Sequence, residues 1–203
     1  MTRVEQEMIN RFGESRVSTY QAQGEDEISL LLLELELRTP VTVVMTNGLA
    51  DKLMDMPEKF KDRNRCELYF CLPSYWEWED IENPNMNWIF PALQRLGKHL
   101  LTKDTFYNAG HSFQANKEGE SISQTMKQTH FVLNDPILLE EQMAPIEGEG
   151  IHFYGVIPIF QDEFEFKNYK GHFKFMRKFT GKNNTEKLDD FRESVRKSRL
   201  KLF

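Results

Sequence analysis

The chain has 203 residues, of which 39% are hydrophobic and 29% charged, with a formal net charge of −6 at pH 7. This length can bury a sizeable core, the composition is that of a folded protein, and the negative charge argues against a nucleic-acid-binding domain. No apolar run reaches the roughly 20 residues that cross a bilayer, and the N-terminus lacks the apolar region of a secretory signal, so we expect a cytoplasmic protein without a membrane partner.

The N-terminal part of the chain predicts one helix followed by strands. Residues 2–12 place apolar side chains on one side of a helix that ends at Gly13. Residues 17–20 are expected to form a loop or a weak strand. Residues 28–38 alternate apolar and polar in their second half, which is typical of a strand with one covered face. Residues 41–46 follow after a gap short enough for a hairpin, so these two strands are predicted to be antiparallel.

Residues 65–72 predict a third strand, and this strand carries the only two cysteines of the chain, Cys66 and Cys71. Side chains at an odd offset in a strand point to opposite faces. The two thiols are therefore not expected to form a disulfide with each other.

An aromatic and acidic loop then leads into the clearest helix of the sequence, at residues 88–101. Pro91 is tolerated only in the first turn, so the N-cap is expected at Asn87 or Phe90. We predict that the apolar stripe of this helix shares one core with the alternating leucines of the second strand. The stripe and the leucines are Ile89, Leu93, Leu96 and Leu100, and Leu31, Leu33, Leu35 and Leu37.

The C-terminal part predicts two further strands and two helices or more. Residues 129–133 alternate as a strand, and residues 151–160 are apolar enough for a strand that is buried on both faces. Pro158 should interrupt its pairing. Asp162 is expected to cap a helix that Gly171 breaks into two short ones. Its aromatic face should return to the core with Phe166, Tyr169, Phe173 and Met176, and a basic helix should begin at residue 185.

Few residues of the sequence indicate a catalytic, metal-binding or partner-binding site. The five histidines show no metal-ligand spacing, and no nucleophile or nucleotide motif occurs, so we expect no metal, no cofactor and no catalytic residues. Tyr75, Trp76 and Trp78 are either an exposed patch for a partner or a lid on the core, and the lid is favoured. Gly110 and His111 are candidates for function, but the favoured interpretation is a histidine that fixes this loop to the core.

Five motifs, in this order and spacing, resemble the suppressor of fused (SUFU) domain family over about residues 27–179. They are T-N-G-L-A-D (46–51), C-E-L-Y-F-C-L-P (66–73), N-W-I-F-P-A-L-Q-R-L-G (87–97), G-H-S-F (110–113) and G-V-I-P-I-F-Q-D-E-F-E-F-K (155–167). Thr46, Gly48, Asp51 and Pro158 are the family-motif residues that we single out. Ala50 departs from the pattern, which has a small hydroxyl residue there.

The resemblance implies an α/β (α+β) fold, a mixed central β-sheet with helices packed on it in a single SUFU-like domain. It implies a domain at residues 25–180, preceded by a helix and loop (1–24) and followed by a basic helix (181–203) that packs on the domain or extends from it.

The resemblance also implies a protein-binding role without catalysis. The chain is similar to stand-alone bacterial members that act as antitoxins or immunity proteins, and its acidic charge suits a basic toxin as the protein partner. On this hypothesis Tyr75, Trp76, Trp78, Gly110 and His111 are the partner-binding candidates. The alternatives are a regulatory adaptor for another protein, or a small-molecule enzyme that uses the His111 loop.

Overall fold

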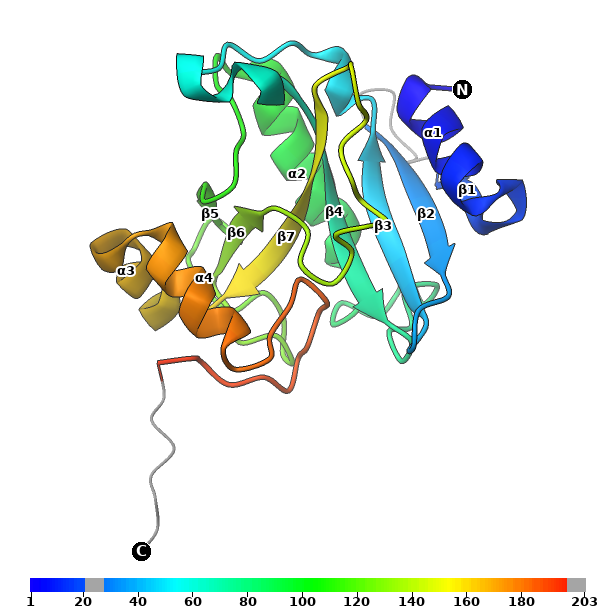
Figure 1. The fold of residues 1–203 in the computed structure, drawn as a ribbon. Helices are drawn as coiled ribbons and strands as arrows, with labels where there is room; N and C mark the ends of the chain where they lie inside the picture. Colours follow the sequence, from blue (N-terminus) through cyan, green and yellow to red (C-terminus); the bar gives the residue numbers. More distant parts are fainter. Residues whose placement is uncertain (21–27, 197–203) are drawn as a thin grey trace, which may run out of the picture.

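The structure, a computed structural model, describes residues 1–20 and 28–196. Within these residues the chain forms a seven-stranded mixed sheet in the order β1-β2-β3-β4-β7-β6-β5 (Figure 1). Every neighbouring pair is antiparallel except β4 and β7, which are parallel. The strands are β1 (Val17–Tyr20), β2 (Ser29–Leu35), β3 (Val41–Asn47), β4 (Arg65–Pro73), β5 (Ser112–Gln114), β6 (His130–Asn134) and β7 (Ile151–Ile159).

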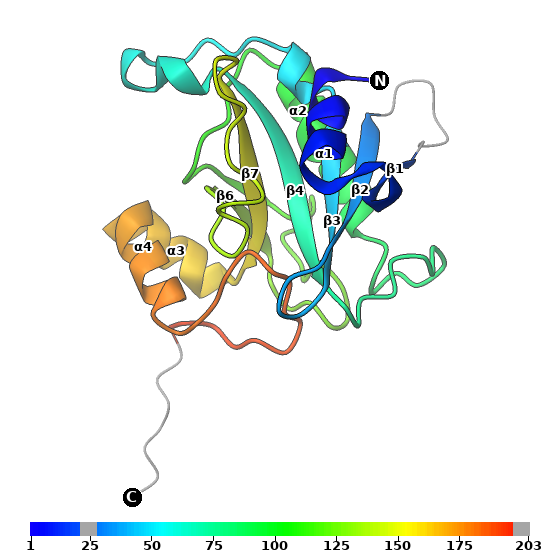
Figure 2. The ribbon, with the colours of Figure 1, turned by 45° about the vertical axis from the view of Figure 1, so that its right-hand side comes forward.

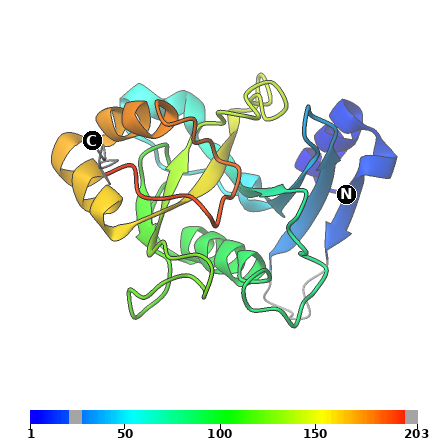
Figure 3. The same cartoon turned by 90° about the horizontal axis from the view of Figure 1, so that it is seen from below.

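Helices cover both faces of this sheet, which confirms the predicted α+β class. Seen along the sheet in Figure 3, α2 lies on one side, and α1 and the α3–α4 pair lie on the other. The helices are α1 (Arg3–Phe12), α2 (Ile89–Thr102), α3 (Gln161–Lys170) and α4 (His172–Thr180), with short 3₁₀ segments η1 (Glu14–Arg16), η2 (Leu49–Asp51) and η3 (Glu58–Arg63). None of the helices in the described ranges is both long and apolar enough to span a bilayer.

The expectation of one core shared by β2 and α2 is wrong for the face that we chose. Leu31, Leu33 and Leu35 pack against α1, whereas the α2 stripe packs against Leu30 and Leu32 on the opposite face. Successive strand residues project to opposite sides, and β2 is covered on both. The same alternation confirms that Cys66 and Cys71 lie on different faces, where both are buried and free.

The N-cap of α2 lies one residue after Asn87 and two residues before Phe90, the two predicted positions. This N-cap is Trp88, whose side chain makes no capping hydrogen bond. Pro91 is in the first turn as predicted, where a missing backbone N–H leaves no intrahelical bond unmade.

Pro158 does not interrupt the pairing of β7, contrary to the prediction. It pairs in register with Phe131 of β6, and β7 continues to Ile159. The Pro158 carbonyl accepts a hydrogen bond from the side chain of Arg192 rather than from the backbone N–H of a neighbouring strand. The pairing of β7 with β4 ends at Gly155, before this residue. The following helix starts at Gln161 with Phe160 as its N-cap, rather than Asp162.

Gly171 separates α3 from α4 with a φ of 88°, which confirms two short helices. The break also changes which aromatic residues reach the core. Tyr169 and Phe173, predicted to be buried, are each 78% exposed, whereas Phe175 and Phe179 are buried. The periodicity of one helix does not continue past a residue with this φ. The single helical face predicted across Gly171 is therefore wrong.

The predicted C-terminal helix is absent from the described residues after Thr180. Residues 185–196, hereafter the C-terminal strap, run in turns from α4 across the lower end of the sheet (Figure 2). The Leu188 N–H donates to the Cys71 carbonyl of β4, and the Glu186 side chain accepts three backbone N–H groups. These tertiary bonds replace the local bonds of a helix. Residues 21–24 and 197–203 of the predicted terminal segments lie outside the described residues.

Candidate functional site

The Gly110–His111 loop is held to β6 by its backbone. The Gly110 N–H donates to the Leu133 carbonyl, and the Leu133 N–H donates to the His111 carbonyl, both at 2.8 Å. Gly110 has a φ of 94°, and a Cβ there would come within 3.1 Å of the His172 ring. The loop therefore requires glycine for both its conformation and its contact with α4.

The His111 ring is half-buried beside Phe106, with 5.0 Å between ring centroids. Burial lowers the pKa of His111, and the nearby Lys167 ammonium lowers it further, so the ring is mostly neutral at pH 7. Burial also lowers the pKa of His172 to about 4. His172 bonds Asn134 through Nε2 at 2.8 Å, and its buried Nδ1 has no hydrogen-bond partner.

Lys167 and Ser112 lie next to this loop. The Lys167 side chain comes from α3, is 8% exposed, and donates from Nζ to Ser112 Oγ at 3.1 Å. No carboxylate pairs with Lys167 in the described part of the chain, and burial lowers its pKa. No sequence pattern indicates this contact, because it joins residues that are far apart in the chain.

The predicted aromatic patch is divided between core and surface. Trp76 is 4% exposed, its Nε1 donates to the Met86 carbonyl at 3.0 Å, and its ring packs edge-on against Trp88. Trp78 is half-buried on the same core. Tyr75 is 48% exposed and donates from its hydroxyl to Asp190 of the strap at 2.8 Å. Tyr75 is therefore the member most accessible to a partner.

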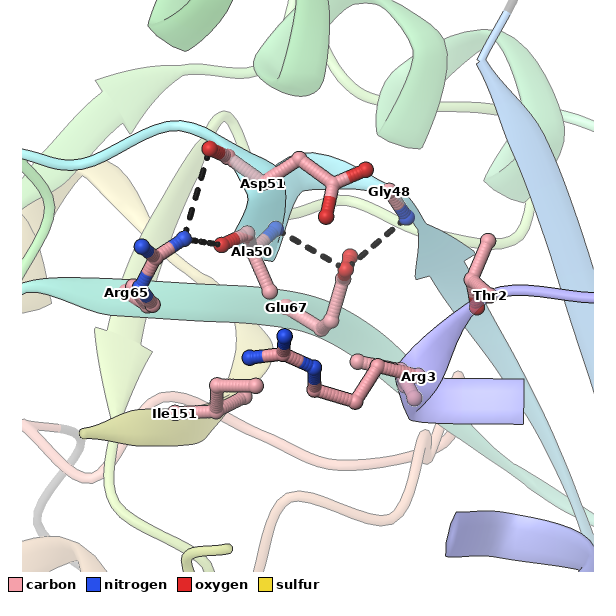
Figure 4. Close-up of a pocket in the computed structure, with 9 residues that line it drawn as sticks. Thr2, Arg3, Gly48, Ala50, Asp51, Arg65, Glu67 and Ile151 are labelled. Carbon is pink, nitrogen blue, oxygen red and sulfur yellow. Dashed lines mark hydrogen bonds between the residues drawn. The ribbon is translucent and has the colours of Figure 1, made fainter. Parts of the chain in front are cut away.

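The family-motif residues Thr46 and Gly48 surround a buried carboxylate, Glu67 of β4. Figure 4 shows Glu67 with the backbone of Gly48 and Ala50. Glu67 Oε2 accepts from Thr46 Oγ1 at 2.5 Å, and Oε1 accepts from the backbone N–H groups of Gly48 and Ala50 at 2.9 and 3.0 Å. The residue at position 50 contributes only its backbone to this carboxylate. A methyl side chain there leaves these bonds intact, although the pattern has a hydroxyl.

Arg65 and Asp51 complete this region. The Arg65 guanidinium donates to the carbonyls of Ala50 and Asp51. A cavity of about 70 Å³ separates these groups and Glu67 from the first residues of α1. Burial raises the pKa of Glu67 to about 7, although the hydrogen bonds that its carboxylate accepts act in the opposite direction. The motif residues Thr46, Gly48 and Asp51 indicated this region in the sequence, but no pattern indicated that Glu67 is its central group.

A second buried carboxylate, Glu163 of α3, holds the strap. Arg192 donates to both oxygens of Glu163 at 2.7 Å, and the Val195 N–H donates to Oε1 at 2.8 Å. Arg192 also donates to the carbonyl of the motif residue Pro158 at 2.8 Å. The pair is 7% and 0% exposed, so this fork-shaped ion pair is shielded from water.

Glu186 holds the other end of the strap. Its carboxylate accepts from Tyr69 and from the N–H groups of Ile137, Leu138 and Leu139 at 2.8 to 3.2 Å. Glu186 lies over Gly155 of β7, where a Cβ would come 3.0 Å from the Glu186 Cβ. The strap thus fits against the sheet because β7 has no side chain at this point.

The predicted site residues do not converge on one site. Thr46, Gly48 and Asp51 lie near α1, Gly110 and His111 lie near α4, and Tyr75 and Pro158 contact the strap. No group of three or more His, Cys, Asp or Glu side chains within residues 1–20 and 28–196 is arranged to hold a metal ion.

The fold and its buried carboxylates define a small α+β domain that fastens its own C-terminal segment across a mixed sheet. The chain belongs to the suppressor of fused family, since the model of the family "Suppressor of fused protein (SUFU)" matches residues 24–193. No curated protein sequence matches the chain significantly.

Solved structures show the same fold. A protein described as a SUFU homologue from Neisseria gonorrhoeae has a TM-score of 0.65 and 16% identity, covering 96% of this chain and 97% of its own. A chain of the Sufu–Fu complex has a TM-score of 0.66 and 17% identity, with 95% and 90% covered. Drosophila Suppressor of Fused has a TM-score of 0.59 and 18% identity; the match covers 85% of this chain but 44% of that protein.

Proposed function

We propose that this chain is a non-catalytic protein-binding domain that acts as an antitoxin or immunity protein in the cytoplasm and occludes a cognate toxin. The observation that carries the proposal is the use of the buried carboxylates. Glu67, Glu163 and Glu186 bind groups of this chain, so they stabilise the fold and leave recognition to the surface. The likeness to a chain of the Sufu–Fu complex, a structure of two proteins bound together, supports the same role.

In this proposal the protein neutralises the toxin by stoichiometric occlusion. The net charge of −6 would steer a basic toxin toward the surface. Tyr75 is the aromatic candidate that a partner can reach, because Trp76 is buried. His111 would affect binding only by ordering its loop.

Co-expression with the toxin candidate encoded by the neighbouring gene tests the proposal. We expect Tyr75→Ala to weaken protection of the cell, and His111→Ala to leave most of it intact. Phe191→Ala serves as the control for Tyr75→Ala, since the Phe191 ring lies near Tyr75 and is 82% exposed. Recovery of a regulatory protein with the tagged chain from its native cell, and no toxin, would favour the adaptor alternative.

The Lys167–Ser112 contact is the observation that favours the second candidate function, a small-molecule enzyme that uses the His111 loop. A buried lysine with a lowered pKa can accept a proton from a serine hydroxyl and activate it as a nucleophile. Treatment with a fluorophosphonate followed by mass spectrometry tests this alternative. Labelling of Ser112 that is lost in Lys167→Met would support it, and an unlabelled Ser112 would exclude it.

A further inference from the structure

The α3–α4 corner, residues 166–182, has the opposite charge to the chain as a whole. It contains six Lys and Arg residues and no Asp or Glu, in a protein whose net charge is −6. Such a local excess is not needed to keep an acidic protein in solution. It creates a positive region on a surface that otherwise repels anions.

Two large aromatic side chains project from this corner. Tyr169 and Phe173 stand two residues before and two residues after Gly171, and each is 78% exposed. The core of the corner is filled by Phe175 and Phe179 instead. Aromatic residues and arginine are enriched in protein–protein interfaces, and both are exposed on this corner.

Three of the positive charges of the corner are available to a partner. Lys170, Lys174 and Arg177 are exposed, and none of them forms an ion pair with any of the described residues. Lys170 Nζ lies 4.1 Å from the Tyr169 ring centroid, so charge and aromatic surface are adjacent. A ligand on this corner would meet both at once.

We propose that the α3–α4 corner binds an acidic protein segment that carries an apolar anchor. Carboxylates of the segment would pair with Lys170, Lys174 and Arg177, and the anchor would pack on Tyr169 and Phe173. This inference rests on the proposed protein-binding role, but not on the partner being a toxin.

A short protein segment fits the corner better than other anions do. Helices of 10 and 9 residues are each about 15 Å long, so few charges of a ligand can be contacted. A nucleic acid or an anionic membrane extends beyond the corner and would meet the acidic remainder of the chain. Its longer-range repulsion would offset the local attraction.

Binding of a fluorescein-labelled peptide of Asp and Glu with two central leucines tests the proposal on the full chain. We expect K170E/K174E to weaken binding at least about tenfold, since it reverses the contacting charges. The control K98E/K103E changes the net charge equally, at two exposed lysines near the end of α2. It should weaken binding less than about threefold. Equal losses in both variants would overturn the proposal, because they would reflect net charge alone.

The aromatic contact is tested by F173A, with F191A as the matched control at an exposed phenylalanine outside the corner. We expect weaker peptide binding in F173A only. Tighter binding to single-stranded DNA of equal charge, or to vesicles with equal parts of phosphatidylserine and phosphatidylcholine, would assign the corner to those ligands instead. Self-association abolished by K170E/K174E would assign it to a second copy.

The outcome is separable from that of the proposed function. Peptide binding at the corner without neutralisation of any toxin would support this inference and contradict the antitoxin role. Neutralisation that K170E/K174E leaves unchanged, with no peptide binding, would do the reverse.

Discussion

Glu67 is a carboxylate that the fold can hold in either protonation state. When it is ionised, Thr46 and two backbone N–H groups donate to it. When it is protonated, its hydroxyl can donate to Thr46 Oγ1, and Thr46 can donate to the Leu68 carbonyl at 3.3 Å. Because the ionised form is fully buried, the fold favours the proton, which raises the pKa from its ordinary value of 4.5 to about 7.

We predict that Glu67→Gln alters the pH dependence of stability. Between pH 4.5 and 7 folded Glu67 keeps a proton that the unfolded chain has lost, so its contribution is complete below pH 4.5 and is lost as pH rises through 7. Glutamine mimics the protonated form at every pH. The free energy of unfolding of the variant, relative to wild type, should therefore rise by up to about 3 kcal/mol across this window. Urea denaturation over this pH range measures it, and a constant difference would contradict it.

Single residues with tertiary partners were the hardest to interpret from sequence. Glu163, Glu186 and Arg192 were covered by the sequence analysis only as members of two predicted helices. Their roles depend on groups 29 to 117 residues away, which no local pattern reveals. The positive φ of Gly110, in contrast, could be expected from the sequence, because this backbone conformation favours glycine.

We predict that the attachment of the C-terminal strap to α3 depends on Arg192. Arg192→Ala would leave the Glu163 carboxylate buried without its cation, which should cost about 3–5 kcal/mol and expose the strap to proteases. Arg3→Ala is the control, since it removes an exposed ion pair with Glu149 and should cost under about 1 kcal/mol. Chemical denaturation and limited proteolysis measure both, and similar losses in the two variants would contradict the account.

The two faces of β2 give a second prediction about the elements of the fold. Leu35→Asp would bury an unpaired carboxylate against α1 and should cost several kcal/mol or unfold the protein. Glu36→Lys, at an exposed side chain of the next residue, loses one ion pair with Arg16 and should change stability by under about 1 kcal/mol. Chemical denaturation compares them. Comparable effects would mean that the register of β2 is wrong.

Elements were predictable where one periodicity ran without interruption. The alternation in β2 and the stripe of α2 each gave the correct element, although pattern alone could not say which face of β2 met which helix. The prediction failed at Tyr169 and Phe173, where Gly171 breaks the period, and at the strap, where tertiary bonds override a weak helical pattern.

For the whole molecule, we propose that the strap folds as one cooperative unit with the sheet. A boundary at residue 180 would leave Glu186, Leu188 and Val195 outside the domain, although each is buried in it. The aromatic candidate binding residues were predicted from residue type alone. In the structure Tyr75 is exposed, whereas Trp76 is buried. The identity of the partner could not be predicted from the sequence, because binding depends on the complementarity of two surfaces rather than on a short motif.

Charge steering is a prediction for the molecule as a whole. If the partner is a basic toxin, the association rate should fall steeply with added salt, while the dissociation rate should change much less. Stopped-flow mixing at several ionic strengths separates the two rates. An association rate that is independent of salt would contradict the role assigned to the net charge of −6.

In the proposed function, this SUFU-family chain would protect the cell by occluding a toxin, one molecule for one molecule. The most direct measurement titrates the purified chain against a fixed amount of the purified neighbouring toxin and follows the residual toxin activity. We expect the residual toxin activity to fall linearly and to reach zero at about one equivalent of chain, as in a tight one-to-one complex. Complete loss of toxin activity at a small fraction of an equivalent would instead show turnover, and would contradict the proposal.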